Sequence, residues 1–174
     1  MTPIRPVVFC GDSAVDMVVR LPGAPGRPAT EITPEPELVA GGAVANSAAA
    51  AAKLGVKYWA VANGAAAAAK LGVKCAFMGS VGADGYGEFL RRDFEQQGVD
   101  THDLVVVPGA FTLMVICVVD RTGERFFGIY PAHNAAGMRL RPEQINEASI
   151  REGLWLHVSG FSLLESPTRE AVLH

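Results

Sequence analysis

Two glycines before an alanine-rich stretch form the group of residues with the clearest potential chemistry. Gly41-Gly42 precede Asn46, where a helix of high alanine content is predicted to begin. Glycine lets a ligand approach the backbone, a helix N-terminus offers free N–H groups, and the Asn side chain carries a donor and an acceptor. This combination suits a polyhydroxylated ligand. A tight turn with an asparagine cap explains the same residues without a ligand.

Two carboxylates follow the first predicted strand. Gly11-Asp12 end its apolar run and Asp16 comes four residues later. Carboxylates at the ends of strands in an α/β sheet can accept hydrogen bonds from sugar hydroxyls, although Asp12 alone is also a typical turn residue. The glycines from Gly82 to Gly87 do not match GxGxxG, and no GxxxxGK[ST] occurs. Dinucleotide sites and Walker-type phosphate sites are therefore disfavoured.

The elements that must position these residues alternate between strands and helices. Pro6–Cys10 predicts a central parallel strand, and Cys75–Val81 predicts a strand followed by the glycine loop and a helix over Glu88–Gln97. Further apolar runs predict strands at Leu104–Val107, Thr112–Val119, Arg125–Tyr130 and Trp155–Val158, the last of them buried. A hairpin turn is expected at Asp120–Gly123, a short helix at Pro142–Ile150, and another helix capped by Ser166.

A segment of 15 residues occurs twice with one difference. Residues 43–57 and 60–74 match except for Ser47 against Gly64. One near-identical pair indicates a recent or engineered duplication rather than a solenoid, whose copies number at least about three. The first copy follows Gly42 and the second precedes Cys75, so neither has both expected neighbours. We expect either two helices with residues 58–62 as a spare strand or linker, or one copy in the native helix position.

Composition excludes several classes of function. The 174 residues carry a net charge of −3 from interspersed charges, which disfavours nucleic acid as a partner. No apolar run approaches the length of a membrane span, so no membrane association is expected. The three cysteines, Cys10, Cys75 and Cys117, lack metal-ligand spacing and are predicted to be buried thiols of a cytoplasmic protein, with no metal site.

An ordered series of motifs resembles the ribokinase-like, or PfkB-type, carbohydrate kinases over almost the whole chain. Its members are Gly11–Asp16, Gly41–Asn46, Lys53–Gly55, Gly79–Gly87, Gly98–Thr101, Asp120–Arg125 and Ser159–Leu163. The resemblance implies an α/β fold, the α/β/α sandwich of that family, present in part and carrying a small β-sheet lid. Residues 1–174 would form the N-terminal part of one domain, with lid strands from about 15–38 and 104–130.

The resemblance also implies a site. Asp16, Gly42 and Asn46 correspond to contacts with sugar hydroxyls, and Asp12 and Gly41 join them as candidates on their own chemistry. The lid residues Tyr130 and Asn134, and Ser159 beside them, correspond to further substrate contacts.

Full-length members of that family use ATP and Mg²⁺. Their second signature, Asp-Thr-x-Gly-Ala-Gly-Asp, supplies the anion-hole backbone and the catalytic aspartate, and it is absent from this sequence. We therefore expect the chain to lack the ATP site and to have no kinase activity by itself.

The substrate and the partners are less determined. Fructose, ribose and keto-deoxy sugar acids are candidates, and the absence of arginine directly after Tyr130 favours a neutral sugar. A noncatalytic sugar-binding or self-associating module, an engineered duplication, and a nucleoside kinase fragment are the alternatives. A homodimer could form through the lid or through an open sheet edge.

Overall fold

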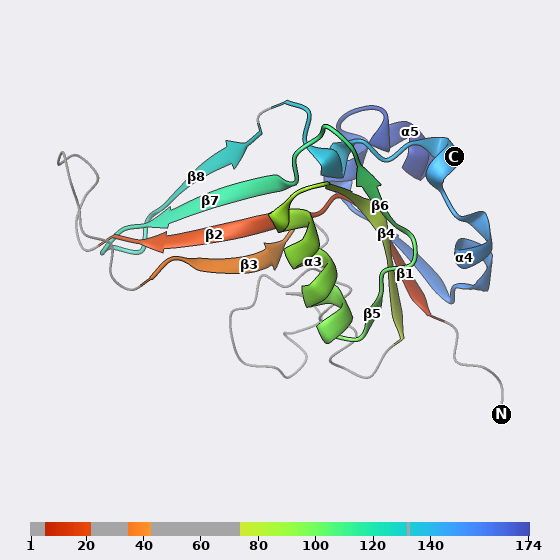
Figure 1. Cartoon of the computed structure of the whole chain (residues 1–174), viewed down its shortest axis with the longest axis horizontal. Coiled ribbons are helices and arrows are strands. Elements are labelled where there is room, and N and C mark those ends of the chain that lie inside the picture. The colour runs from red at the N-terminus through yellow and green to blue at the C-terminus, as the bar shows by residue number, and fades with distance from the viewer. Residues whose placement is uncertain (1–5, 22–34, 43–73, 132) are drawn as a thin grey trace.

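The computed structural model describes residues 6–21, 35–42, 74–131 and 133–174, which form two β-sheets with helices on the larger one (Figure 1). The main sheet is parallel, with the order β5-β4-β1-β9 and with β6 also paired to β4. Its strands are β1 (Val7–Gly11), β4 (Cys75–Gly82), β5 (Val99–Asp100), β6 (Leu104–Val107) and β9 (Trp155–Val158). The first predicted strand is therefore central, as expected.

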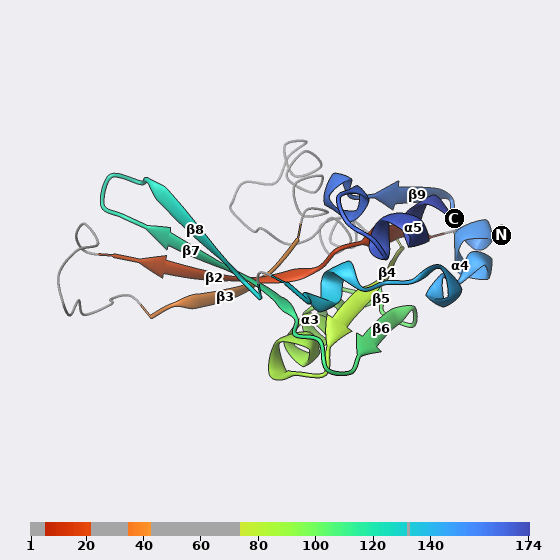
Figure 2. The same ribbon diagram turned by 90° about the horizontal axis from the view of Figure 1, so that it is seen from above.

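The second sheet, here called the lid sheet, extends from one end of the molecule (Figure 2). Its order is β3-β2-β7-β8, from β3 (Glu37–Gly41), β2 (Ala14–Arg20), β7 (Leu113–Val119) and β8 (Arg125–Tyr130). β2 pairs with β3 antiparallel and with β7 parallel. Strand β6 falls within the residues assigned to the lid from sequence, but it belongs to the main sheet.

Helices cover both faces of the main sheet. Helix α3 (Gly85–Gln96) lies on one face, and α4 (Glu147–Glu152) and α5 (Thr168–Leu173) lie on the other. The short 3₁₀ helices η1 (Ala136–Met138), η2 (Pro142–Gln144) and η3 (Gly160–Leu163) complete the described elements. This arrangement is the predicted α/β/α sandwich in part. No helix among the described residues is long and apolar enough to cross a membrane.

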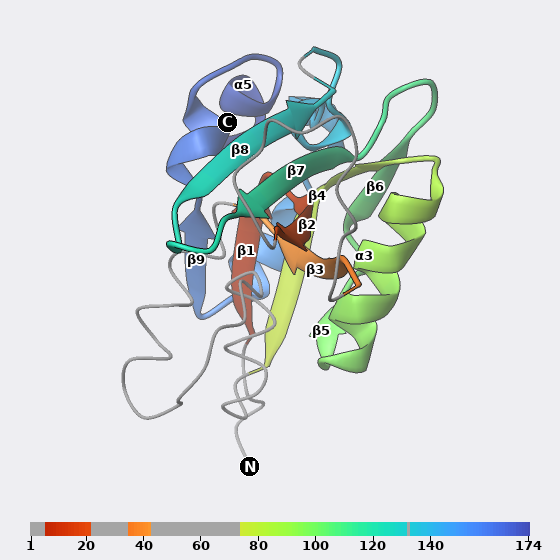
Figure 3. The same cartoon turned by 90° about the vertical axis from the view of Figure 1, so that its left-hand side faces the viewer.

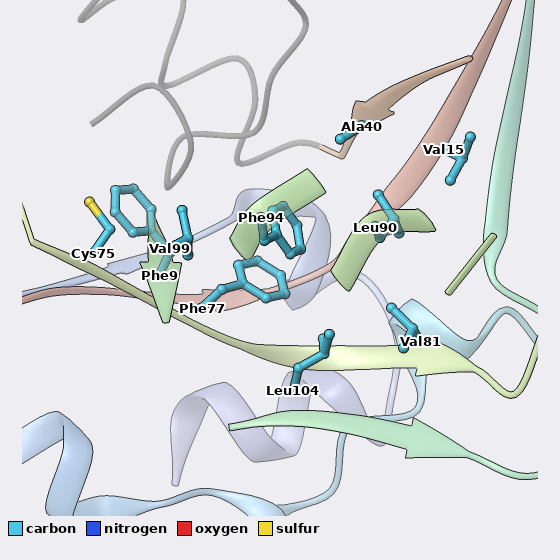
Figure 4. Close-up of a cluster of buried hydrophobic side chains, with 10 residues drawn as sticks. All are labelled: Phe9, Val15, Ala40, Cys75, Phe77, Val81, Leu90, Phe94, Val99 and Leu104. Carbon is cyan, nitrogen blue, oxygen red and sulfur yellow. The ribbon is translucent and has the colours of Figure 1, made fainter. Parts of the chain in front are cut away.

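Successive side chains of the central strand β1 point to opposite faces of the main sheet, so this strand contributes to two hydrophobic cores. Phe9 contributes to a cluster under α3, whereas Val8 and Cys10 point to the cluster under α5. In the α3 cluster, the rings of Phe77 and Phe94 are fully buried with centroids 4.8 Å apart (Figure 4). The lid residues Val15 and Ala40 belong to the same cluster. The root of the lid sheet is therefore packed into the core of the main body.

Several predictions need correction. Strand β9 is an edge strand with largely exposed residues, not a buried one, because only β1 pairs with it among the described strands. The helix predicted at Pro142–Ile150 is divided into η2 and α4, because the side chain of Asn146 caps a new helix at Ser149 N.

Three smaller details also differ from the predictions. Helix α3 begins at Gly85, three residues before the predicted start, because Asp84 caps it. The Ser166 hydroxyl donates to Glu170 instead of capping α5. Cys117 is half-buried, whereas Cys10 and Cys75 are buried as expected. The duplicated segment, apart from Lys74, lies outside the described residues.

Candidate functional site

The two sheets are joined by a linker of two residues, Asp12 and Ser13, between the end of β1 and the start of β2. Both residues are buried, with 4% and 1% of their surface exposed. Buried polar groups need partners, and each of these residues is bonded to another part of the main body. The linker therefore fixes where the lid sheet leaves the sandwich.

Asp12 is held by a serine that follows β9. The Ser162 hydroxyl accepts a hydrogen bond from Asp12 N at 3.0 Å and donates to Asp12 Oδ1 at 3.2 Å. Ser162 is fully buried, and a side chain on Gly11 would collide with its hydroxyl. Glycine at the end of β1 thus makes room for the serine that orients Asp12.

Ser13 is held from the other side of the linker. Its hydroxyl donates to Ser80 O at 3.2 Å, and the Ser80 hydroxyl donates to Ala136 O at 2.7 Å. A Cβ atom on Gly137 would lie 2.8 Å from Ser13 O, so η1 packs closely against the linker. These bonds connect the linker to β4 and to the segment that follows the lid sheet.

Asp16 lies next to the two glycines on which the sequence argument rests. A Cβ atom on Gly41 would lie 2.5 Å from the Asp16 carboxyl group, so any larger residue there would displace that carboxyl group. Gly42 has a φ of +125°, and a Cβ atom on it would lie 3.1 Å from Asp12 O. The structure therefore brings together Asp12, Asp16, Gly41 and Gly42 at the root of the lid sheet.

The Asp16 carboxylate has unused hydrogen-bonding capacity. It is half-buried, and no described residue donates a hydrogen bond to it. Burial raises the pKa of Asp16 from 3.8 to about 6, because removal of water penalises the charged form. At pH 7 the group is still mostly ionised. It can therefore accept hydrogen bonds from a ligand that enters the junction.

The other predicted site residues lie away from Asp16 or use their polar groups in local hydrogen bonds. Tyr130 pairs with Met114, which pairs with Val15, so the register puts Tyr130 on the face of the lid sheet opposite Asp16. Asn134 has a φ of 63°, and its Nδ2 donates to Gly109 O at 3.1 Å.

Ser159 is buried, and its hydroxyl accepts from Phe161 N at the start of η3. Asn46 lies outside the described residues. The structure does not place Tyr130, Asn134 or Ser159 in contact with Asp16, and their role in substrate binding stays a prediction.

The glycine loop before α3 does not fit a nucleotide phosphate. Gly87 N donates to Asp84 Oδ1 at 2.8 Å, and Gly82 N donates to Thr112 Oγ1 at 2.9 Å. A Cβ atom on Gly82 would lie 2.6 Å from Ala110 O, so the chain itself occupies the space that glycine leaves. The described residues also contain no group of carboxylates, histidines or cysteines suited to a metal ion.

Ser162 is the residue that sequence reasoning missed. It lies in the stretch Ser159–Leu163 that contributes to the resemblance, from which the sequence predicts Ser159 as the site residue. The two are three residues apart, and only the path of the chain shows that Ser162 reaches Asp12, 150 positions away. The repeated serine in a Ser-Gly-Phe-Ser stretch was the available signal.

Comparison with known proteins agrees with this fold. The pfkB family carbohydrate kinase model matches residues 60–174. A probable fructokinase-4 of Arabidopsis thaliana is 35% identical over 167 residues, covering 96% of this chain and 44% of that protein. A 5-dehydro-2-deoxygluconokinase of Halalkalibacterium halodurans is 36% identical over 133 residues, covering 76% of this chain and 35% of the relative.

Solved structures give the same picture. The fructokinase of Xylella fastidiosa superimposes with a TM-score of 0.73 at 27% identity, over 97% of this chain and 46% of that protein. That fructokinase has also been solved with bound ATP. The chain thus spans less than half the length of these relatives. With the family match, the lid sheet and the glycine-lined junction all in agreement, the chain belongs to the PfkB family of carbohydrate kinases.

Proposed function

We propose that this chain is the sugar-binding half of an ATP-dependent sugar kinase, with a neutral sugar such as fructose as its ligand. The observation that carries the proposal is the Asp16 carboxylate, half-buried and without a hydrogen-bond donor among the described residues, beside two glycines at the lid root. A sugar presents several hydroxyl donors on a compact ring. Such a ligand would supply the donors that the carboxylate lacks.

Each residue of the junction has a distinct proposed part. Asp16 would accept hydrogen bonds from one or two sugar hydroxyls, and Gly41 and Gly42 would let the ring approach the backbone. Asp12, fixed by Ser162, would hold the linker between the sheets and so set the position of the lid root. The Asp16 carboxylate would repel a sugar acid, which agrees with the lack of arginine after Tyr130.

We further propose that the chain alone does not transfer a phosphoryl group. The glycine loop is filled by internal bonds, and the second family signature is absent from the sequence. Phosphoryl transfer depends on positioned groups around the phosphates, and in the family that signature supplies the anion-hole backbone and the catalytic aspartate. The relatives solved with ATP are about twice as long.

Titration of the purified chain with sugars tests the proposal. Fructose should bind more tightly than ribose, 2-keto-3-deoxygluconate or adenosine in isothermal calorimetry, and ATP should not be consumed with any of them. Asp16→Asn should weaken fructose binding by about tenfold or more, because a charge-assisted acceptor is lost. Glu37→Gln is the matched control, since it removes an exposed carboxylate from the same lid sheet.

Three results would contradict the proposal. Equal binding by the Asp16→Asn and Glu37→Gln variants would remove Asp16 from the site. Tightest binding of adenosine would favour a nucleoside kinase. Sugar-dependent consumption of ATP would show that the chain is catalytic by itself.

We also propose a homodimer through the lid sheet. Phe127 and Ile129 on β8 are 64% and 63% exposed, and the register puts them on the same face as Asp16. A second copy bound there would bury this apolar face and cover the sugar. Light scattering should show a dimer that Ile129→Asp dissociates, and a monomeric wild-type chain would reject this arrangement.

A further inference from the structure

The short helix η3 has its polar and apolar side chains in unusual places. Among its residues only Ser162 is buried, with none of its surface exposed, whereas Phe161 and Leu163 are 56% and 43% exposed. Apolar side chains are ordinarily buried and hydroxyls ordinarily exposed, so this arrangement is the reverse of the usual one. A buried hydroxyl at this position therefore needs a reason other than packing.

The hydrogen bonds of Ser162 supply that reason. Its hydroxyl accepts from Asp12 N at 3.0 Å and donates to Asp12 Oδ1 at 3.2 Å, and both bonds are buried. A hydroxyl can donate and accept at once, so one side chain holds both the backbone and the carboxylate of Asp12. The Ser162 amide in turn donates to Ser159 O at 3.1 Å. The orientation of Asp12 therefore depends on where η3 lies.

Close contacts continue from Asp12 to the Asp16 carboxylate. A Cβ atom on Gly42 would lie 3.1 Å from Asp12 O, and a Cβ atom on Gly41 would lie 2.5 Å from the Asp16 carboxyl group. Gly41 is also the β3 partner of Ala14, the first residue of β2. Because the contacts are this tight, a shift of Asp12 must move the glycines or the carboxyl group of Asp16.

The position of the linker makes this dependence direct. The linker leaves the carboxyl end of β1, and the lid sheet lies across that end of the main sheet (Figure 3). Only Asp12 and Ser13 separate β1 from β2, so there is no longer loop that could absorb a shift. Hydrogen bonds weaken steeply when distance or angle changes, so a small displacement of Asp16 would reduce its affinity for a hydroxyl.

We propose that Ser162 is a positioning residue of the sugar site. It does not touch the sugar, but it holds Asp12 and, through the two glycines, sets the place of the Asp16 carboxylate. The inference rests on the proposed sugar-binding function and adds to it a dependence of sugar affinity on η3. Because coupling between two parts of a protein is reciprocal, bound sugar must in turn stabilise η3.

Titration of the full chain with fructose tests this role through a matched pair of variants. The hydroxyls of Ser162 and Thr168 are both fully buried, and each accepts from a backbone N–H, that of Asp12 or that of Leu140. Ser162→Ala should weaken fructose binding by about fivefold or more, and Thr168→Val should leave it unchanged. Urea denaturation should show similar losses of stability, so stability alone would not explain the difference.

Hydrogen exchange measures the reciprocal effect. The amides of Ser162 and Leu164 donate across η3, each at 3.1 Å, to Ser159 O and Phe161 O. Saturating fructose should slow exchange at both amides of the wild-type chain, and should not slow exchange at Leu164 in the Ser162→Ala variant. The amide of Ala171 in α5 is the internal control and should exchange at the same rate with and without fructose.

The outcomes separate this inference from the proposed function. If the wild-type chain binds fructose, equal binding by Ser162→Ala, or equal losses for Ser162→Ala and Thr168→Val, would overturn the positioning role and leave the sugar site intact. Exchange in η3 that ignores fructose would do the same, and this measurement needs no variant to fold. A wild-type chain that does not bind fructose would overturn the sugar site and the positioning role together.

Discussion

At the scale of single residues, most polar groups of the junction are hydrogen-bonded within the protein, whereas the Asp16 carboxylate has no donor among the described residues. Asp12, Ser13 and Ser162 use their hydrogen-bonding groups to hold the two sheets together. Asp16 does not, and its raised pKa of about 6 reflects the free energy of leaving a carboxylate partly out of water without a donor. Binding groups are often kept in this state, because the ligand supplies the missing partner.

The raised pKa predicts opposite effects of pH on sugar binding and on stability. Fructose affinity should be nearly constant above pH 7 and should fall below about pH 6, as Asp16 gains a proton and loses its acceptor charge. Calorimetric titrations at several pH values between about 5 and 8 measure the change in fructose affinity directly. Affinity that does not change across this range would mean that Asp16 does not contact the sugar.

Stability should follow the reverse sign. The folded-state pKa of Asp16 lies above its unfolded value of 3.8, so the folded chain binds more protons between about pH 4 and 6 and gains stability from this group as pH falls. Asp16→Asn should therefore raise the free energy of unfolding at pH 7 by about 1 kcal/mol or less, because the carboxylate still meets solvent, and the melting temperature should rise accordingly. The difference from wild type should vanish near pH 4.

At the scale of elements, the start of α3 depends on one pair of side chains, the half-buried Asp84 and the buried Thr112. Asp84 caps the helix and also accepts from Thr112 N and Thr112 Oγ1, both at 2.8 Å. Burial alone would raise the pKa of Asp84, but these bonds, with those from Gly87 and Tyr86, lower it below the ordinary value. The pair therefore fastens the helix to the segment that leads into β7.

Removing the threonine hydroxyl should test this connection. Thr112→Val keeps the shape of a side chain that is 2% exposed, but leaves Gly82 N without its acceptor. We expect a loss of about 1 to 3 kcal/mol in the free energy of unfolding, measured by urea denaturation. Thr122→Val is the control, because it breaks a similar bond to Asp120 on an exposed turn. Equal effects of the two substitutions would contradict a special role for the Asp84–Thr112 pair.

Elements with local signals were predictable from the sequence. The apolar run of β8 was predicted with its observed limits, Arg125–Tyr130, because β-branched and aromatic residues mark a strand wherever it pairs. Pairing depends on distant partners, so the sequence did not show that β6 leaves the lid or that β9 lies at an edge. Of the site, Asp16 and its glycines were found through motif chemistry, whereas Ser162 required the fold.

At the scale of the whole molecule, the sequence contains one more copy of the repeated segment than the order of elements requires. Gly42 should be followed, and Cys75 preceded, by a single copy of the repeated segment, and the sequence supplies two. Seventeen additional residues between β3 and β4 add to the conformational entropy lost on folding.

Deleting one copy should stabilise the chain. Removal of residues 58–74 joins the first copy to Cys75, and removal of residues 43–59 joins Gly42 to the second copy. The two products differ at one position, serine or glycine, so both should show a higher melting temperature and tighter fructose binding than the full chain. A lower melting temperature for both products would show that the added copy supports the fold.

The parallel pairing of β2 with β7 has a consequence for the order of folding. Ala14 pairs with Leu113 and Arg20 with Val119, so the centre of the lid sheet joins segments that lie about 100 residues apart in the sequence. Such a contact closes a long loop, and its entropic cost delays it relative to local pairs such as β7 with β8. During synthesis, Asp16 is made early but gains its neighbour Val115 only after most of the chain has emerged. Sugar binding by this chain would therefore report a stage of assembly that follows the synthesis of β7.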